Sequence, residues 1–231
     1  MPAKNSLKEY VEGGFYHVYN RGVEKRVIFQ DLQDYKVFLS YLKCYLEPPK
    51  RAITREITIK NQNFRRPERA LNNFFEKLDL LAFCLMPNHF HFIVKQIQQK
   101  SMEYFMRSLL TRYTNYFNRR YQRVGHLFQG TYKASLIDRE EYLLHLSRYI
   151  HLNPVKETPL RMREKILLDS FSSYKDFIGK QRTAWLKPEI ILFYFDTNKP
   201  EDTESYKAFV EDYLQEEENI IPHLLLDSDD M

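Results

Sequence analysis

Two histidines separated by one residue, His89 and His91, are the first side chains in this sequence that could hold a metal ion together. On a β-strand, residues i and i+2 point to the same face, so both imidazoles project together while Phe90 packs the other way. Two imidazoles on one rigid strand can bind a divalent metal if a third group converges on them. Such a pair also arises incidentally in strands, so it does not establish a metal site alone.

A second candidate lies on a predicted helix that ends before Pro154, where His145, Tyr149 and Asn153 follow one another at four-residue spacing. This spacing aligns the three side chains along one face. A tyrosine hydroxyl has a pKa of about 10 and needs a metal, a base or a charged neighbour to act as a nucleophile. The amide oxygen of Asn153 can bind a hard metal ion. Alternatively, Tyr149 packs against a sheet and Asn153 only ends the helix.

The segment GHLFQGTYKAS (125–135) follows a helix rich in arginine. Arginine and lysine bind phosphates, while tyrosine and phenylalanine stack on unpaired bases. A turn followed by an edge strand would also explain the two glycines of this segment.

Charge divides the chain into a basic body and an acidic tail. The net charge of the whole chain is +4. From Glu201 to Met231 there are eleven acidic residues and one lysine, which leaves 34 basic and 20 acidic residues before that point. A body this basic suits a polyphosphate partner such as nucleic acid, although basic residues often only solvate a surface.

Hydrophobic periodicity defines the elements that must position these residues. A capping box of Asp138 and Glu141 is expected to start the last helix, and Pro87-Asn88 to form the turn of a hairpin. In chain order we predict a strand at 13–22, a helix at 31–47, a hairpin at 78–96, a helix at 100–122, a strand at 130–137 and a helix at 138–152.

This order predicts an α+β fold: a ferredoxin-like βαββαβ antiparallel sheet with helices on one face, plus a C-terminal helical extension. We expect a catalytic domain at 10–155 and a helical extension with an acidic tail at 156–231. Residues 48–77 are predicted to be an insertion, in which 51–60 suits a strand pair.

The composition is that of a soluble globular protein, with 43% hydrophobic and 29% charged residues in 231. No apolar run approaches the roughly 20 residues that span a bilayer. The first residues lack the apolar stretch of a secretory signal, so we expect a cytoplasmic protein without a membrane partner. The two cysteines, Cys44 and Cys84, are too few for a disulfide framework or a four-cysteine zinc site.

Four segments resemble the single-tyrosine HUH transposases, and among them the REP-associated tyrosine transposases. They are GGFYHVYNRG, LMPNHFHFIV, GHLFQGTYKAS and YIHLNPVK, with DSFSSYKDF as a weaker match, in the order and spacing of the family. Together they span about residues 10–180. The pairing of MPNHFH with YIHLNPVK in one chain is specific to this family.

The resemblance implies that His89 and His91 are metal ligands and that Tyr149 is the nucleophile on a helix that faces them. Asn153 stands where related enzymes carry a polar residue, often glutamine, that completes the coordination. The implied ion is Mg²⁺ or Mn²⁺, and the implied product is a 5′-phosphotyrosine on single-stranded or hairpin DNA. We further expect Lys133, Arg119 and Arg120 to bind phosphates.

Two other functions are considered. A non-catalytic module that binds single-stranded nucleic acid would have the same sheet but would need no metal and form no covalent product. An ordinary metal-dependent nuclease would activate water, which requires more carboxylates than MPNHFH and YIHLNPVK provide. Both a monomer and a homodimer are compatible with a single tyrosine per site.

Overall fold

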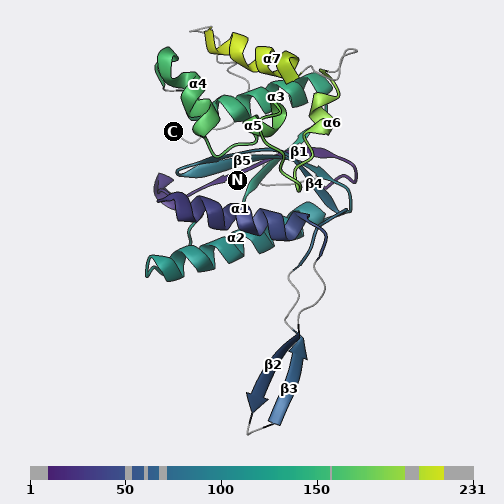
Figure 1. Ribbon diagram of the computed structural model, residues 1–231, viewed down its shortest axis with the longest axis vertical. Helices are drawn as coiled ribbons and strands as arrows, with labels where there is room; N and C mark the ends of the chain where they lie inside the picture. The colour runs from purple at the N-terminus through teal and green to yellow at the C-terminus, as the bar shows by residue number, and fades with distance from the viewer. Residues whose placement is uncertain are drawn as a thin grey trace, which may run out of the picture.

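The centre of the protein is a four-stranded antiparallel sheet in the order β4-β5-β1-β6 (Figure 1). The computed structural model describes residues 10–49, 54–59, 62–67, 72–156, 158–195 and 203–215. The strands are β1 (Phe15–Arg21), β4 (Leu78–Met86), β5 (His89–Gln96) and β6 (Lys133–Ile137). Helix α1 (Leu32–Leu46) joins β1 to the β4–β5 hairpin, and α2 (Ser101–Arg120) joins β5 to β6. The α+β class and the ferredoxin-like order are therefore confirmed.

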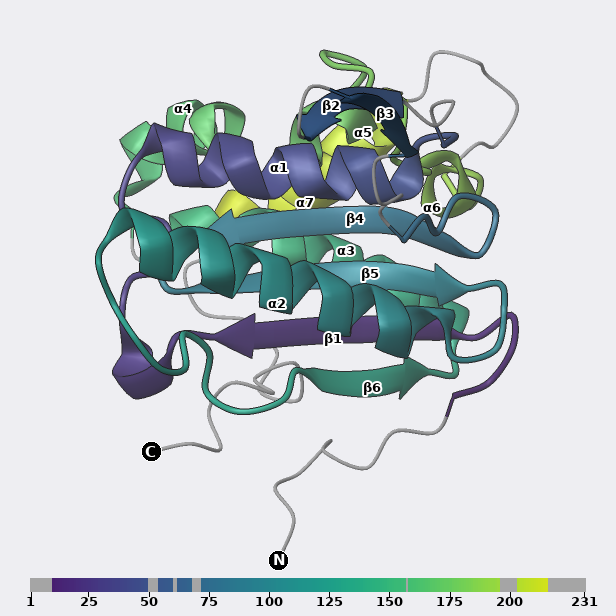
Figure 2. The same ribbon diagram turned by 90° about the horizontal axis from the view of Figure 1, so that it is seen from below.

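Helices cover both faces of this sheet (Figures 1 and 2). Helices α1 and α2 cover one face, where Phe90 and Phe92 of β5 share their core. Helix α3 (Glu140–Leu152) covers the other face, where Ile93 packs with Leu146 and Ile150. The expectation of helices on one face is thus too narrow. Strands β4 and β5 are nearly continuous apolar runs, and such runs are typical of strands that are buried on both sides.

The expected C-terminal helical extension is present and completes the second layer. Its apolar side chains, among them Tyr174, Phe177 and Val210, belong to the same core as Ile93, so it does not form a core of its own. The acidic residues beyond 215 lie outside the described residues. The elements of this part are the 3-10 turn η2 (Asn153–Val155), α4 (Leu160–Asp169), α5 (Tyr174–Phe177), α6 (Glu189–Leu192) and α7 (Thr203–Gln215).

Within the predicted insertion 48–77, β2 (Thr54–Ile59) and β3 (Gln62–Pro67) form an antiparallel pair of their own. A strand pair is therefore present, but only β2 lies within the expected range 51–60, and its partner β3 follows it. Figure 1 shows this pair apart from the four-stranded sheet.

The predicted capping box at the start of α3 is wrong. The N-cap residue of α3 is Arg139, and no side chain makes a capping hydrogen bond there. Glu140 and Glu141 instead lie in the first turn, where carboxylates stabilise the positive end of the helix dipole.

Among the described helices, none is both long and apolar enough to cross a bilayer.

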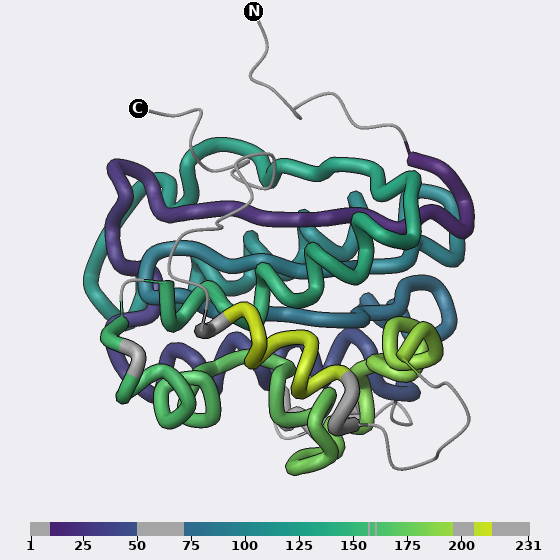
Figure 3. The backbone as a smooth tube through the Cα atoms, turned by 90° about the horizontal axis from the view of Figure 1, so that it is seen from above, coloured from purple at the N-terminus to yellow at the C-terminus, as the bar shows by residue number. Residues whose placement is uncertain are grey.

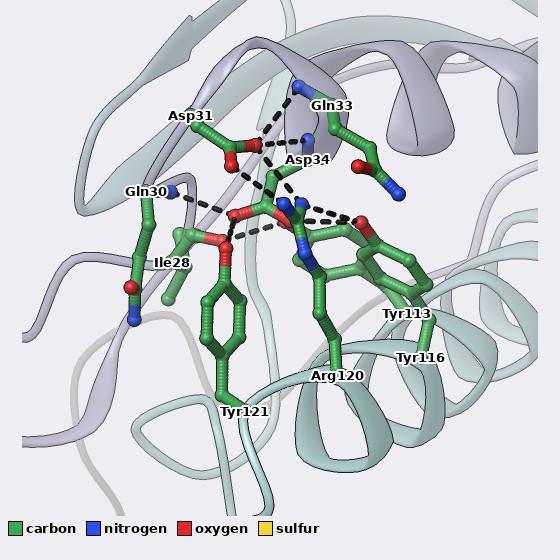
Figure 4. A network of polar contacts seen from close by, with 9 residues as sticks. All are labelled: Ile28, Gln30, Asp31, Gln33, Asp34, Tyr113, Tyr116, Arg120 and Tyr121. Atoms are coloured by element: carbon green, nitrogen blue, oxygen red, sulfur yellow. Dashed lines mark hydrogen bonds and ion pairs between the residues drawn. The ribbon is translucent and has the colours of Figure 1, made fainter.

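A buried carboxylate joins α1 to α2 (Figure 4). Asp34 is completely buried and accepts hydrogen bonds from the hydroxyls of Tyr116 and Tyr121, at 2.9 and 2.8 Å. Arg120 lies 2.7 Å from Asp34 and 2.6 Å from Asp31, the N-cap of α1. The start of α1 is thereby held against the end of α2.

Helix α7 braces α3 on the outside (Figure 3). The guanidinium of Arg148 lies 4.2 Å from the ring centroid of Phe209 and 4.4 Å from that of Tyr213. His151 is fully buried and hydrogen-bonds through Nδ1 to the hydroxyl of Tyr206 at 2.7 Å, and through Nε2 to Ser173 at 2.8 Å. These contacts flank Tyr149 in sequence and fix the helix that carries it.

We expect Asp34→Ala to lower the free energy of unfolding by about 3 kcal/mol, because it leaves Arg120 and two tyrosine hydroxyls without their shared acceptor. Urea denaturation followed by circular dichroism measures this loss. Asp31→Ala is the control and should cost much less, because Asp31 is exposed and contributes only an N-cap and a surface ion pair. Equal losses in the two variants would contradict the role assigned to Asp34.

Burial lowers the pKa of His151 to about 3, whereas the unfolded chain binds this proton near pH 6.5. Between these values the unfolded state holds one more proton, so stability is complete above pH 6.5 and falls as the pH is lowered. The contribution of His151 to this fall is about 1.4 kcal/mol per pH unit. In urea titrations from pH 6.5 to 4.5 in EDTA, His151→Gln should flatten the slope by up to that amount. An unchanged slope would contradict the burial of a neutral His151.

Candidate active site

The predicted nucleophile and the two histidines meet where β5 begins. The β1–β5 register pairs His89 with Arg21 and His91 with Tyr19. The ring centroids of His89 and His91 are 5.1 Å apart. Tyr149 on α3 faces His91 edge-on, with 6.0 Å between ring centroids and 87° between ring planes. The structure therefore brings these three predicted residues together on one face of the sheet.

Hydrogen bonds orient both imidazoles in the same sense. His89 Nδ1 lies 2.6 Å from the side-chain oxygen of Asn88, to which it donates. His91 Nδ1 lies 3.0 Å from Nε2 of His17 on β1. Metal-binding histidines usually have one ring nitrogen held in this way, which fixes the tautomer and aims the other nitrogen. In both rings Nε2 is thus the nitrogen that would bind a metal.

His91 is held in the neutral form. Its burial, together with the nearby His17, His89 and Lys156, keeps the pKa of His91 well below its usual value. Only a neutral imidazole can donate a nitrogen lone pair to a metal. The environment of His91 therefore favours a neutral imidazole, as a metal ligand must be, over a protonated imidazolium.

Lys156 brings a positive charge to Tyr149. Its Nζ lies 3.8 Å from the centroid of the Tyr149 ring, and the tyrosine side chain is only 8% exposed. A cation at this distance over an aromatic face is attracted to the ring. It also favours negative charge at the tyrosine oxygen or at a phosphate beside it.

Asn153 is buried at the C-terminal end of α3, one helical turn after Tyr149. Its Nδ2 has no hydrogen-bond partner among the described residues. No cluster of three or more His, Cys, Asp or Glu suited to a metal ion occurs among the described residues, so a metal at the two histidines would need a third ligand of another kind, for which Asn153 is the candidate. Two imidazoles and one amide oxygen would leave coordination positions of a divalent ion open for phosphate oxygens.

The three predicted phosphate-binding residues do not lie together. Lys133 on β6 is opposite Tyr19, with its Nζ 5.9 Å from the centroid of that ring, on the face that carries His91. Arg119 and Arg120 end α2 on the opposite face of the sheet. Arg120 is moreover engaged by Asp31 and Asp34. Of the three, only Lys133 belongs to the site.

Three site residues were missed by the sequence reasoning: His17, Tyr19 and Lys156. The rings of His17 and Tyr19 stack on each other with 4.9 Å between centroids, and both stack against His91. Strand alternation in GGFYHVYNRG could have placed His17 and Tyr19 on one face. Lys156, the lysine of YIHLNPVK, follows the turn at Asn153–Val155, and the sequence does not predict in which direction the chain leaves this turn.

Comparisons with known proteins agree with this arrangement. Residues 52–153 match the family model described as "Transposase IS200 like", and this match begins inside the predicted insertion. No curated protein matches the chain. A solved structure of a REP-associated tyrosine transposase bound to a REP hairpin has a TM-score of 0.50 and 12% identity, and the match covers 80% of this chain and 97% of that one. Residues 52–153 are therefore similar to the IS200-like transposases, and the chain shares its fold with the REP-associated tyrosine transposase.

Proposed function

We propose that this protein cleaves single-stranded DNA and rejoins strands through a covalent 5′-phosphotyrosine on Tyr149. The observation that carries the proposal is the approach of Tyr149 on α3 to His91 on β5, with His89 beside it. A module that only binds nucleic acid does not require a tyrosine beside an oriented imidazole.

The proposed metal ligands are His89 and His91 through Nε2 and Asn153 through its amide oxygen. Oxygen ligands favour Mg²⁺ and imidazoles favour Mn²⁺, so both ions suit this set. A bound divalent ion would polarise the phosphate that is to be cleaved. The protein's own part is to hold His91 neutral and to fix the direction of both rings.

In the proposed step, the Tyr149 oxygen loses its proton to solvent and forms a bond to phosphorus. The bond from phosphorus to the 3′ oxygen breaks, and that oxygen takes up a proton to become a free 3′-hydroxyl. The 5′ phosphate remains esterified to Tyr149. Because the ester conserves the phosphodiester bond, a second 3′-hydroxyl can reverse the step and join the strands without ATP.

Two lysines supply charge in this proposal. Lys156, above the Tyr149 ring, stabilises negative charge as the tyrosine attacks. Lys133, on the edge strand β6, binds a neighbouring phosphate.

The proposed substrate is hairpin-bearing DNA. It is supported by the basic body of the chain and by the neighbour of similar fold, which was solved with a REP hairpin. A protein that acts on such DNA is expected to work where the chromosome is accessible, in the cytoplasm of a bacterial cell, as a monomer or a homodimer.

Tyr149→Phe should abolish the covalent adduct, because it removes only the attacking oxygen. The measurement is a denaturing gel with a pool of labelled hairpin-bearing single-stranded DNAs in Mg²⁺, Mn²⁺ or EDTA. The wild type should give a shifted band that requires metal, and His89→Ala should lose it.

Tyr142→Phe is the matched control, since it makes the same change on the same helix and should retain the adduct. An adduct that persists in Tyr149→Phe would assign the nucleophile to another tyrosine. Firm DNA binding with no adduct in any metal would favour the non-catalytic module.

Lys156→Ala should slow adduct formation about tenfold, which corresponds to about 1.4 kcal/mol, the size of a close charge interaction that is partly exposed to water. Lys156→Arg should restore most of the rate, because it returns the positive charge. Single-turnover rates with saturating DNA measure both. If Lys156→Arg is as slow as Lys156→Ala, the charge is not the reason for the effect.

A further inference from the structure

Arg21 is a cation on the face of the sheet that carries His91, and the proposed step gives it no role. It is the last residue of β1, the strand between β5 and β6 (Figure 2). Side chains alternate along a strand, so Arg21 shares a face with His17 and Tyr19, which stack against His91. Its partner across the sheet is His89. Because the side chains of such a pair begin about 5 Å apart, Arg21 emerges beside a proposed metal ligand.

The backbone around Arg21 is held independently of the arginine side chain. The carbonyl of Arg21 accepts a hydrogen bond from the amide of Gln129 at 2.8 Å, and Gly22 forms a β-bridge with Phe128. Only glycine fits at position 22, because a Cβ there would lie 2.2 Å from the carbonyl oxygen of Arg26. The turn after β1 therefore forms without help from the guanidinium of Arg21.

The same turn fixes Arg21 relative to His89. The amide of Gly22 donates to the carbonyl of Asn88 at 2.8 Å, and Nδ2 of Asn88 donates to the carbonyl of Lys25 at 3.4 Å. The side-chain oxygen of Asn88 in turn accepts the hydrogen bond that orients His89. Asn88 thus connects the end of the strand that carries Arg21 to the ring of His89.

A neutral amide orients the guanidinium of Arg21. Its Nε donates to Oε1 of Gln129 at 2.6 Å. Because Gln129 carries no charge, this hydrogen bond directs the side chain without cancelling its positive charge. Arg120, by contrast, is paired with the carboxylates of Asp31 and Asp34. The planar fork of a guanidinium matches the oxygens of a phosphate, so Arg21 has the chemistry of a phosphate ligand.

Arg21 and Lys156 lie at different histidines. Lys156 lies over the ring of Tyr149, which faces His91, whereas Arg21 is the strand partner of His89. A phosphate attacked by Tyr149 in front of the two imidazoles would lie between these cations. The phosphodiester brings one negative charge, and the tyrosine oxygen brings a second as it attacks. A cation fixed in advance on the phosphate side stabilises this growing charge.

We propose that Arg21 is a catalytic residue that binds a non-bridging oxygen of the phosphate attacked by Tyr149 and stabilises the charge that develops there. Gln129 is the positioning residue that directs the guanidinium to this oxygen. The inference rests on the proposed function. Arg21 transfers no proton, so the bonds that form and break are those of the proposed step.

Arg21→Ala tests this role, and Arg139→Ala is the matched control, because it removes the same side chain at the exposed N-cap of α3. At saturating single-stranded DNA, Arg21→Ala should form the adduct about 100-fold more slowly than the control, the usual effect of losing one donor to a developing negative charge. Arg21→Lys should recover only part of the rate, since it returns the charge without the planar fork. A rate equal to that of the control would overturn the proposal.

A methylphosphonate at the position that the wild type cleaves separates a phosphate contact from a structural role. Replacing one non-bridging oxygen by a methyl group removes the negative charge that Arg21 is proposed to stabilise. With one of the two stereoisomers, Arg21→Ala and the wild type should therefore react at similar rates. If the loss caused by Arg21→Ala is the same on both stereoisomers as on the phosphodiester, the contact with a non-bridging oxygen is contradicted.

A double-mutant cycle tests the part assigned to Gln129. Alone, Gln129→Ala should slow the adduct roughly tenfold, the usual effect of losing a partner that orients a functional side chain. Combined with Arg21→Ala it should cause no further loss, because it acts only through Arg21. Equal losses in the presence and absence of Arg21 would show that Gln129 does not position it.

DNA binding separates this inference from the proposed function. In Tyr149→Phe protein, fluorescence anisotropy measures the affinity for a labelled single strand of about 20 nucleotides, from about 50 to 200 mM salt. Adding Arg21→Ala should make the slope of log K against log salt shallower by about 0.7, the value for one phosphate contact on a single strand, whereas adding Arg139→Ala should leave it unchanged. If the wild type forms no adduct, the proposed function fails, and this slope still tests Arg21. A slope unchanged by Arg21→Ala would then refute the phosphate contact.

Discussion

The alternation of side chains along β5 is the constraint on which the two halves of the molecule depend. Phe90 and Phe92 point into the core beneath α1 and α2, so His89 and His91 must point to the opposite face. The β1 register then places Tyr19 beside His91. A slip of one residue in this pairing would bury the imidazoles among phenylalanines and expose apolar rings at the site. Core packing and catalytic geometry are therefore set by the same register.

Burial keeps the imidazole of His91 neutral, and a hydrogen bond within the sheet offsets the cost of burying it. A fully buried imidazole costs free energy unless its nitrogens are satisfied, and His17 provides a hydrogen bond from the neighbouring strand. The exclusion of water that disfavours the charged ring also strengthens electrostatic interactions at the site. Both the attraction between the ring nitrogen and a metal ion and the effect of the Lys156 charge are therefore larger. His89, which is only partly buried, is oriented by Asn88 in the turn. One ligand is thus fixed by the sheet and the other by the hairpin loop.

Much of the fold follows from local sequence, whereas the surroundings of the site do not. The period of two in HFHFIVKQ and the four-residue spacing of Tyr149 and Asn153 predicted which faces these residues share. The helices of the second layer were predicted, but not that they cover the other face of the sheet, although the continuous apolar character of LDLLAFCLM indicated two buried faces. The placing of Arg120 could not be foreseen, since its partner Asp34 is distant in sequence. A positive charge makes a residue a candidate for binding DNA, but only the tertiary structure shows whether that charge is already paired with a carboxylate.

The segment that matches the transposase family is not sufficient to build this site. Residues 52–153 include both histidines, Tyr149 and Asn153, yet they omit β1 and α7. Strand β1 lies between β5 and β6, so without it the sheet separates and His91 loses His17. Helix α7 holds α3 through Tyr206 and through the rings around Arg148. The proposed metal ligands and nucleophile thus lie within the matched segment, whereas Lys156, His17 and the α7 residues that brace α3 lie outside it.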